Sequence, residues 1–494
     1  MKSILGTIIT LLLISSSISA QVVSDALIFS ETNPNITARS AATGNSLGAL
    51  GGDLSALSTN PAGLGIYRST EISFSPGLSF NNVQTTFGQD TFGIEKSRTQ
   101  RSNFLFGSVG AVFSKKLHSD WKSINFGFGL NRLADFGRSF KFDAVTYGSR
   151  LVTIGENANG KTLDQLNDFE EGLAYDTYLM DLDYNTSDQY VTALTDDNYV
   201  RKSQTVRQSG GINEFAMSIA ANYDHKLYIG FTLGIDFLTL VDNRKYQELE
   251  ETNTIDFLEM RFDEYRTVNG VGANLKLGFI YRINKMFRVG FAAHTPTWFS
   301  LREKYNTTMA GRVYYNGDLQ DTEFTSPEAK YKHNFNTPAA LSLSFGSVFG
   351  KRGFLGVEAE YVDYTWSNFS LSGNDTNIDD ERYIDNINEG IDNLYKGVFR
   401  ARIGGELVFD LFRVRAGYRI QTSPYQESVA GVSDLRHDIS AGIGIRMEHF
   451  YIDMAYVHNL KQFEYIPYTS YSILQQVKGK ASVASVLLTA GVRF

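Results

Sequence analysis

Hydrophobic and polar residues alternate along most of the chain from about residue 70 onward, in stretches of roughly ten residues. In residues 412–421, Phe412 and Val414 lie on one face, and Arg413 and Arg415 lie on the other. A period of two residues predicts β-strands whose two faces meet different surroundings. The polar face is rich in Gly and Arg, which favours an apolar band facing lipid around a roomy, polar interior.

Fourteen segments are expected as strands. They are 70–82, 103–114, 122–140, 212–223, 228–240, 267–283, 286–301, 330–346, 353–369, 399–409, 412–422, 436–447, 450–463 and 482–494. Short connections, such as 283–285, alternate with long ones, such as 141–211 and 370–398. Outer-membrane barrels have short periplasmic turns and long external loops. The sequence therefore predicts an all-β fold, a 14-stranded antiparallel transmembrane β-barrel with both termini in the periplasm.

The composition excludes several other classes of protein. With 42% hydrophobic residues and no Cys, the chain is neither disordered nor built on disulfides or thiolate metal sites. Its formal charge of -8 argues against nucleic-acid binding. Residues 1–20 have the basic start, apolar run and small-residue end of a secretory signal peptide, which predicts cleavage after Ala20. We expect a monomer in the outer membrane of a Gram-negative bacterium, in contact with lipid and lipopolysaccharide.

Residues 21–69 lack strand alternation and are rich in small residues. Asp53 is placed to cap a short helical turn, and Asn60 should end it, because the residue before a Pro avoids the α region. A compact, nearly uncharged segment at this end of the chain predicts a hatch folded inside the barrel, with a disordered leader as the alternative. The expected division is a signal peptide at 1–20, a hatch at 21–69 and a barrel at 70–494.

Several motifs in the chain also occur together in one known family. They are Gly52–Leu57 followed by Asn60, Pro61, Ala62, Gly63 and Leu64; Gly270–Gly278 with Arg288–Gly290; Tyr364–Ser367; and Arg413–Tyr418 reaching Pro424. In this order, from about residue 38 to 494, they resemble the FadL/TodX family of outer-membrane transporters for long-chain fatty acids and hydrocarbons. The resemblance implies a 14-stranded barrel with an N-terminal hatch that passively moves hydrophobic small molecules.

The resemblance also implies a route and an assembly signal. Members of the family release their ligand sideways, through a gap made by a kink in the third strand. Gly127, Gly129 and Gly137 are the candidates for that kink, because Gly inside a strand often marks a bend. Other predicted strands are rich in Gly as well, so these residues could be ordinary. Phe494 resembles the terminal residue that the barrel-assembly machinery reads.

The alternation places many charged side chains in the lumen. They are Lys276, Arg282, Arg288, Glu358, Glu360, Arg400, Arg402, Glu406, Arg413, Arg415, Arg419, Asp438, Arg446 and Asp453. These charges could form Arg–carboxylate pairs that hold the hatch. Alternatively, one arginine pairs with a ligand carboxylate while apolar hatch residues hold the ligand tail. The candidates are Arg400, Arg402, Arg415 and Arg419 for the carboxylate, and Leu47, Leu50 and Leu54 for the tail.

Two other functions stay open. A hemin-binding receptor could use His294 as an iron ligand, and a FadL-like protein shuttle of type IX secretion could bind its partner through loops 141–211 and 370–398. The acidic insert 141–211 lacks a complete calcium-binding loop, so we expect no metal and no cofactor. No G-x-S-x-G or H-E-x-x-H motif is present, and we expect no enzyme activity.

Overall fold

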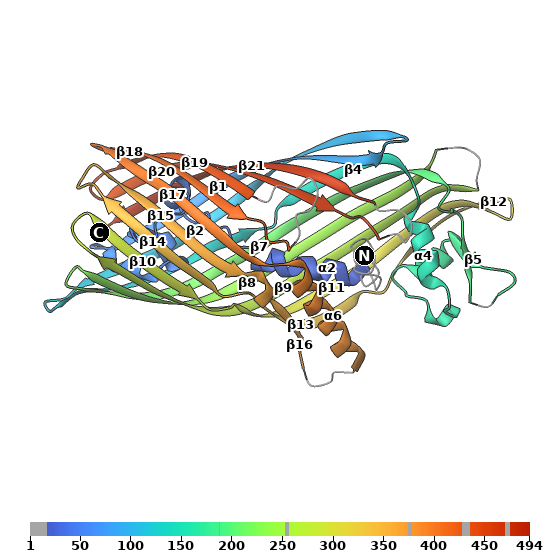
Figure 1. Cartoon of the computed structure of the whole chain (residues 1–494), viewed down its shortest axis with the longest axis horizontal. Coiled ribbons are helices and arrows are strands. Elements are labelled where there is room, and N and C mark those ends of the chain that lie inside the picture. Colours follow the sequence, from blue (N-terminus) through green and yellow to red (C-terminus); the bar gives the residue numbers. More distant parts are fainter. Residues whose placement is uncertain (1–16, 187, 252–255, 374–377, 427–434, 470–474) are drawn as a thin grey trace, which may run out of the picture.

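The computed structural model describes residues 17–186, 188–251, 256–373, 378–426, 435–469 and 475–494. Within them, fourteen strands pair in an antiparallel ring, with β21 hydrogen-bonded to β1, which closes the barrel (Figure 1). The order around the ring is β1, β2, β3, β7, β8, β9, β10, β14, β15, β17, β18, β19, β20 and β21. The predicted fold class is therefore confirmed.

The bounds of the barrel strands agree with most predicted segments. They are β1 (Glu71–Gln89), β2 (Gly93–Lys116), β3 (Trp121–Asp135), β7 (Tyr199–Tyr223), β8 (Leu227–Glu250), β9 (Phe257–Arg282), β10 (Phe287–His294), β14 (Ala340–Val348), β15 (Gly353–Asp363), β17 (Gly397–Phe409), β18 (Phe412–Thr422), β19 (Leu435–Arg446), β20 (Phe450–Tyr465) and β21 (Val477–Arg493).

The remaining elements lie before, between and beyond these strands. The other strands are β4 (Arg138–Tyr147), β5 (Met180–Leu182), β6 (Tyr190–Thr192), β11 (Trp298–Tyr315), β12 (Asp318–Thr325), β13 (Ala329–Asn336) and β16 (Asn368–Leu371). The helices are α2 (Ser17–Ser30), α3 (Ala38–Ala42), α4 (Arg150–Ala158), α5 (Glu171–Asp176) and α6 (Ile378–Leu394), with 3₁₀ turns η1 (Leu54–Leu57), η2 (Pro61–Ile66), η3 (Leu163–Gln165) and η4 (Tyr364–Trp366). No helix among the described residues is long and apolar enough to cross a membrane.

Burial follows the predicted alternation. On β1, Ile72 and Phe74 are about half exposed, whereas Ser73 and Ser75 are buried. The outward face is thus apolar and the inward face polar, the reverse of a soluble protein and the arrangement that a lipid environment requires. The strands β2, β8 and β9 contain 24, 24 and 26 residues, more than the ~9–11 that span a bilayer, so they project beyond it.

Four predicted strands are interrupted where they were expected to be continuous. The segment 286–301 divides into β10 and β11 at Pro296, and 330–346 divides into β13 and β14 at Pro338. Pro cannot donate to a ladder, so pairing stops there, and beyond Pro296 the pairing with β9 resumes one residue out of register. The segment 353–369 likewise divides at the turn η4, and 122–140 divides between the end of β3 at Asp135 and the start of β4 at Arg138.

The predicted external loops are largely folded. Segment 141–211 contains α4, α5 and the β5–β6 hairpin, which pack on the projecting ends of β8, β9 and β11 around the fully buried Phe257, Met260 and Met309. These elements lie at the end of the barrel with the long connections, opposite the short turns (Figure 1). Helix α6 occupies most of segment 370–398. A second apolar core therefore lies at the long-connection end, between this insert and the projecting strand ends.

The chain before β1 runs inside the barrel. The elements α3, η1 and η2 contact strands on different sides of the ring: α3 contacts β18–β21, and η2 contacts β3 and β7–β9. Helix α2 lies near the long-connection end and packs against α6. Residues 1–16 of the predicted signal peptide lie outside the described residues, and cleavage after Ala20 stays a prediction. We call residues 23–66 the hatch segment.

Candidate functional site

The predicted hatch motif forms a tight turn against the barrel wall. Asn60 Nδ2 donates to the Gly48 carbonyl at 2.8 Å, and its Oδ1 accepts from the Ala62 amide at 3.2 Å. The turn approaches the wall so closely that a Cβ on Gly278 would lie 2.1 Å from Asn60 Oδ1, and one on Gly230 would lie 2.3 Å from the Pro61 carbonyl carbon. Glycine at these wall positions makes room for the motif, and Gly63 packs against the hatch itself.

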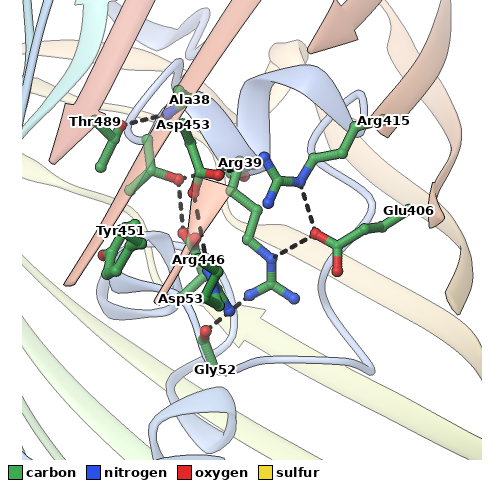
Figure 2. A network of polar contacts seen from close by, with 12 residues as sticks. Ala38, Arg39, Gly52, Asp53, Glu406, Arg415, Arg446, Tyr451, Asp453 and Thr489 are labelled. Carbon is green, nitrogen blue, oxygen red and sulfur yellow. Dashed lines mark hydrogen bonds and ion pairs between the residues drawn. The ribbon is translucent and has the colours of Figure 1, made fainter. Parts of the chain in front are cut away.

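A buried ion-pair network joins the hatch segment to the wall near the short turns (Figure 2). Arg415 donates from Nε to Glu406 and from Nη1 to Asp453, both at 2.7 Å. Arg39 of α3 lies 3.6 Å from the same Glu406 carboxylate and donates to the Gly52 carbonyl at 2.8 Å. The side chain of Arg415 is fully buried. Two arginines, one from the wall and one from the hatch segment, therefore share the carboxylate of Glu406.

A second set of ion pairs lies in the lumen farther from the short turns. Arg400 and Arg402 both bind Glu360, and Arg402 also binds Glu358. Glu358 accepts from the Gly48 amide at 3.1 Å, which connects this set to the hatch segment. Arg419, the last of the four arginines predicted to bind a ligand carboxylate, binds Asp438 and the hatch residue Asn33. Each of the four is thus paired with a carboxylate in this structure.

Helix α2 and the residues after it are held near the long-connection end by further pairs. Asp25 binds Arg266, and Glu31 accepts from Arg436 at 2.5 Å. Although burial alone would raise it, the positive charges of Arg436, Lys461 and Arg400 hold the pKa of Glu31 well below its ordinary value. Sequence reasoning did not find α2 or these contacts, because the short stretch after residue 20 carries little helical periodicity.

The predicted tail-binding leucines pack against the wall. Leu47 and Leu50 form a buried cluster with Phe354, and Leu54 lies in another with Leu57 and neighbours. His294, the candidate iron ligand, is bonded through Nε2 to the Thr59 carbonyl at 2.6 Å. These side chains therefore contribute to seating the hatch segment.

A cavity of about 100 Å³ lies in the middle of the lumen, between α2 and the hatch motif. Arg400 and Arg402 line it, whereas Arg415, Arg419 and the three leucines do not. Two further lining residues, Asp236 and Lys276, lie on β8 and β9. Asp236 was missed from the sequence, although its position in the alternation with Gly234 already places it on the inward face.

The barrel wall is interrupted on one side. β2 pairs with β3 only over Ser108–Lys116, so within the described residues its segment 93–107 has a ladder partner in β1 alone. β3 ends at Asp135, and β4 turns inward across β1, where Asn81 Nδ2 donates to the Gly137 carbonyl at 3.1 Å. We call the gap between β2 residues 93–107 and the β3–β4 junction the seam.

Side chains and the hatch segment cover the seam. Arg101 reaches from β2 to the Gln208 carbonyl of β7 at 3.2 Å. The hatch residue Asn33 donates its amide to the Leu133 carbonyl at 2.9 Å, at the base of the seam. Of the three predicted kink glycines, Gly137 lies at the junction. The other two, Gly127 and Gly129, lie within the continuous β3 ladders and face hatch residue Leu57.

The acidic insert forms ion pairs with the strand ends. Arg150, at the start of α4, binds Glu170 at 2.6 Å and lies 3.5 Å from Glu264 of β9. Although burial alone would lower it, these two carboxylates raise the pKa of Arg150. Among the described residues, no group of three or more His, Cys, Asp or Glu side chains is placed to hold a metal ion.

Solved structures of other proteins share this barrel architecture. The crystal structure of a FadL homologue from Pseudomonas aeruginosa matches at a TM-score of 0.55 and 13% identity, covering 94% of this chain and 99% of that one. The toluene transporter TodX of Pseudomonas putida matches at 0.52 and 12%, covering 94% and 100%. No curated protein sequence matches. A family model described as BamG matches residues 179–447, more than half of the chain. The chain therefore has the barrel fold of the FadL and TodX structures and belongs to the BamG family.

Proposed function

We propose that the protein is a passive outer-membrane transporter for hydrophobic small molecules, such as long-chain fatty acids, which leave the barrel sideways through the seam. The observation that carries this proposal is the missing ladder along β2 residues 93–107. Phe104, on this stretch, is 68% exposed on the apolar outer surface. A molecule released there enters hydrocarbon without crossing water, which suits a hydrophobic cargo.

The hatch segment closes the axial route, so passage requires part of it to move. Helix α2 is the part that fits this role, because a ring of apolar wall residues surrounds it. Members of the ring are Leu133, Ile212, Leu238, Val268, Phe299 and Phe335. When α2 withdraws, this ring becomes an apolar lining at the entrance from the long-connection end.

The comparisons support the proposal at the level of the fold. TodX is described as a toluene transporter, and it has the same barrel architecture at 12% identity. For a ligand with a carboxylate, Arg400 and Arg402 are the two candidate arginines that line the cavity. Such a carboxylate would have to replace Glu358 or Glu360 as their partner.

A lock on α2 tests the proposal. Ser30 Oγ at the end of α2 lies 3.2 Å from Ser367 Oγ, so the pair Ser30→Cys and Ser367→Cys can form a disulfide in this Cys-free chain. The measurement is uptake of labelled toluene and oleate by cells that carry the protein in an outer membrane without another importer. We expect oxidation to abolish uptake and reduction to restore it.

The matched control is a disulfide in a regular part of the wall. Ser79 and Ser485 face each other in the β1–β21 ladder, and both are buried. Ser79→Cys with Ser485→Cys should leave uptake unchanged in either redox state. Equal uptake by the oxidised α2 lock and the control would contradict the proposal.

The two alternative functions have a different signature. The hemin receptor would need His294, which is bonded to the Thr59 carbonyl in this structure. Native mass spectrometry of the protein taken from its own membrane distinguishes the alternatives. A bound fatty acid or hydrocarbon supports transport, whereas haem or a stoichiometric protein partner, as expected of a type IX shuttle, would overturn it.

A further inference from the structure

Four cations lie in two neighbouring rows on the outer surface of β11 and β13. Arg302 faces Lys332 across the ladder, and Lys304 faces Lys330 in the next row. All four residues are exposed. We call them the basic rows. Like charges that face each other directly across a ladder are destabilising, so two such pairs in succession favour a compensating anion.

The basic rows point away from the barrel interior. Leu301, which precedes Arg302, is buried, and Glu303, which follows it, binds the buried Arg266. Successive side chains of a strand point to opposite faces of the sheet. Arg302 and Lys304 therefore lie on the outer face of β11, and their ladder partners lie on the outer face of β13.

The first basic row lies just beyond the apolar outer band of the barrel. Strands β11 and β13 continue from the wall strands β10 and β14 toward the long-connection end (Figure 1). On β9, every outward residue from Tyr281 to Val271 is apolar or aromatic, and the next outward residue, Asn269, faces Arg302. Arg302 is thus about 7 Å along the strand beyond the row of Val271. The headgroup layer of a bilayer is roughly 5–8 Å thick on each side, so this row lies at headgroup depth.

The four cations share a single carboxylate. Glu328 Oε1 lies 3.2 Å from Lys304 Nζ and 3.3 Å from Lys330 Nζ, both in the outer of the two rows. Among the described residues, neither Arg302 nor Lys332 forms an ion pair with a carboxylate. The basic rows therefore carry a surplus of positive charge, and the cations without a partner are those nearest the lipid.

Outward cations farther from the apolar band have acidic partners. Lys245 of β8 lies 3.6 Å from Asp263, and Arg261 of β9 binds Glu323. Protein carboxylates thus compensate the charges that lie farther out in water. At headgroup depth, the anions that can take this part are lipid phosphates, which Arg and Lys bind through charge-assisted hydrogen bonds.

We propose that the basic rows bind a phosphate-bearing lipid of the outer leaflet, lipopolysaccharide, through its phosphate groups. Arg302 and Lys332 donate to a phosphate at headgroup depth, and Lys304 and Lys330 add positive charge farther out. The acyl chains lie along the apolar band, where Trp298 is 50% exposed. The assignment takes the long-connection end as the external one. It is independent of the transport proposal, because it concerns the outer surface of the wall and not the lumen.

The test measures lipid binding to the purified full chain in a non-ionic detergent by native mass spectrometry. The probes are lipid A with its phosphates and the same lipid after their removal. We expect the phosphorylated probe to bind at least about ten-fold more tightly, because the contributions of several cations to an anionic headgroup add up. Equal affinity for the two probes would overturn the proposal. Displacement of lipid A by inorganic phosphate at equal concentration would also overturn it, since the site would then be one for free phosphate.

Two double variants that lose the same charge locate the site. Arg302→Gln with Lys332→Gln should weaken binding of phosphorylated lipid A about ten-fold or more and leave binding of the dephosphorylated probe unchanged. Lys245→Gln with Arg261→Gln should change either affinity by less than about two-fold, because exposed charges more than about 8 Å away are screened at physiological salt. An equal loss in both double variants would indicate attraction by net charge alone and contradict the proposal.

A melting curve separates lipid binding from a structural role of the same residues. In detergent without lipid A, Arg302→Gln with Lys332→Gln should keep or raise the melting temperature, because it removes a pair of like charges. Added lipid A should raise the melting temperature of the wild type more than that of this variant. A lower melting temperature of the variant without lipid would show that the two cations stabilise the fold themselves, against the proposal.

Discussion

The two sides of the barrel differ in how their buried charges are paired and in how continuously their strands are hydrogen-bonded. On the side formed by β14–β21, each strand pairs along its length with the next, and the arginines bind carboxylates that also contact the hatch segment. On the side formed by β2–β9, the β2–β3 ladder stops at Ser108, and among the described residues Asp236 Oδ1 has no hydrogen-bond partner. The hatch segment contacts both sides, through α3 on β18–β21 and through η2 on β3 and β7–β9, whereas the seam lies on the second side.

The difference lies in what surrounds each charge, since both sides contain buried ionisable groups. Arg415 has two carboxylates and Glu406 has two arginines, so charge is balanced locally. Near Asp236, the side chain of Lys276 is paired with Glu214. A locally balanced network stabilises the fold, whereas a buried carboxylate without a cation is costly to bury.

The largest effect is expected from breaking the balanced side at its centre. Arg415→Met leaves Glu406 and Asp453 buried with less positive charge. Removing one partner of a buried ion pair costs about 3–5 kcal/mol, and we expect a loss of that size in the free energy of unfolding. Urea titration in detergent micelles measures it. A loss below about 1 kcal/mol would show that the pairs do not hold this side together.

The same substitution on both sides sharpens the comparison. Asp453→Asn removes a charge-assisted hydrogen bond to Arg415 and should cost about 1.5–3 kcal/mol. Asp236→Asn removes an uncompensated charge and keeps an acceptor for Asn274 and Thr297, so the stability should stay equal or rise. The two urea titrations are run in parallel, and equal losses would contradict the assignment.

A smaller, pH-dependent effect is expected where α2 is anchored. The pKa of Glu31 is held well below its ordinary value of 4.5, so its pairing with Arg436 stabilises the fold at every pH above that value and is lost as the pH falls through the lower, folded value. Glu31→Gln should lower the melting temperature at neutral pH. The difference from the wild type should shrink only below about pH 4.5. A difference that is already absent at pH 6 would contradict the shift.

The smallest effect on stability is expected at the seam. Arg101 makes one partly exposed hydrogen bond across it, so Arg101→Gln should change the free energy of unfolding by less than about 1 kcal/mol. Its effect should appear instead as faster uptake of a hydrophobic probe. Lys116→Gln, an exposed residue in the part of the same strand that pairs with β3, is the matched control and should change neither quantity.

The sequence was sufficient to predict the barrel because its signal is repeated fourteen times. Alternation in segments such as 412–422 identified both the strands and their inward faces, and the ladder of β18 confirms this. Breaks at Pro296 and Pro338 were missed, although Pro in a strand is a local signal for them. The helix α6 was also missed, although Ile384, Ile387 and Ile391 repeat at helical spacing.

The site was harder to predict, because pairing depends on which strands become neighbours. Alternation placed Arg400 and Arg415 in the lumen, but their carboxylates come from other strands. Glu360 is 40 residues from Arg400, and Asp453 is 38 residues from Arg415. No periodicity could show that Asp236 lacks a cation, since this depends on Lys276 pairing with Glu214. Predicting the seam from the sequence would have required knowing where β4 leaves the wall.

Closing the seam with a covalent bond tests the transport account most directly. Asn103 Cγ lies 3.6 Å from the position of a Cβ on Gly137, so Asn103→Cys with Gly137→Cys would join β2 to the β3–β4 junction. The measurement is uptake of labelled toluene and oleate before and after reduction, with Ser79→Cys and Ser485→Cys as the control. The account predicts that the oxidised seam blocks uptake and that reduction restores it. Unchanged uptake through an oxidised seam would contradict lateral release.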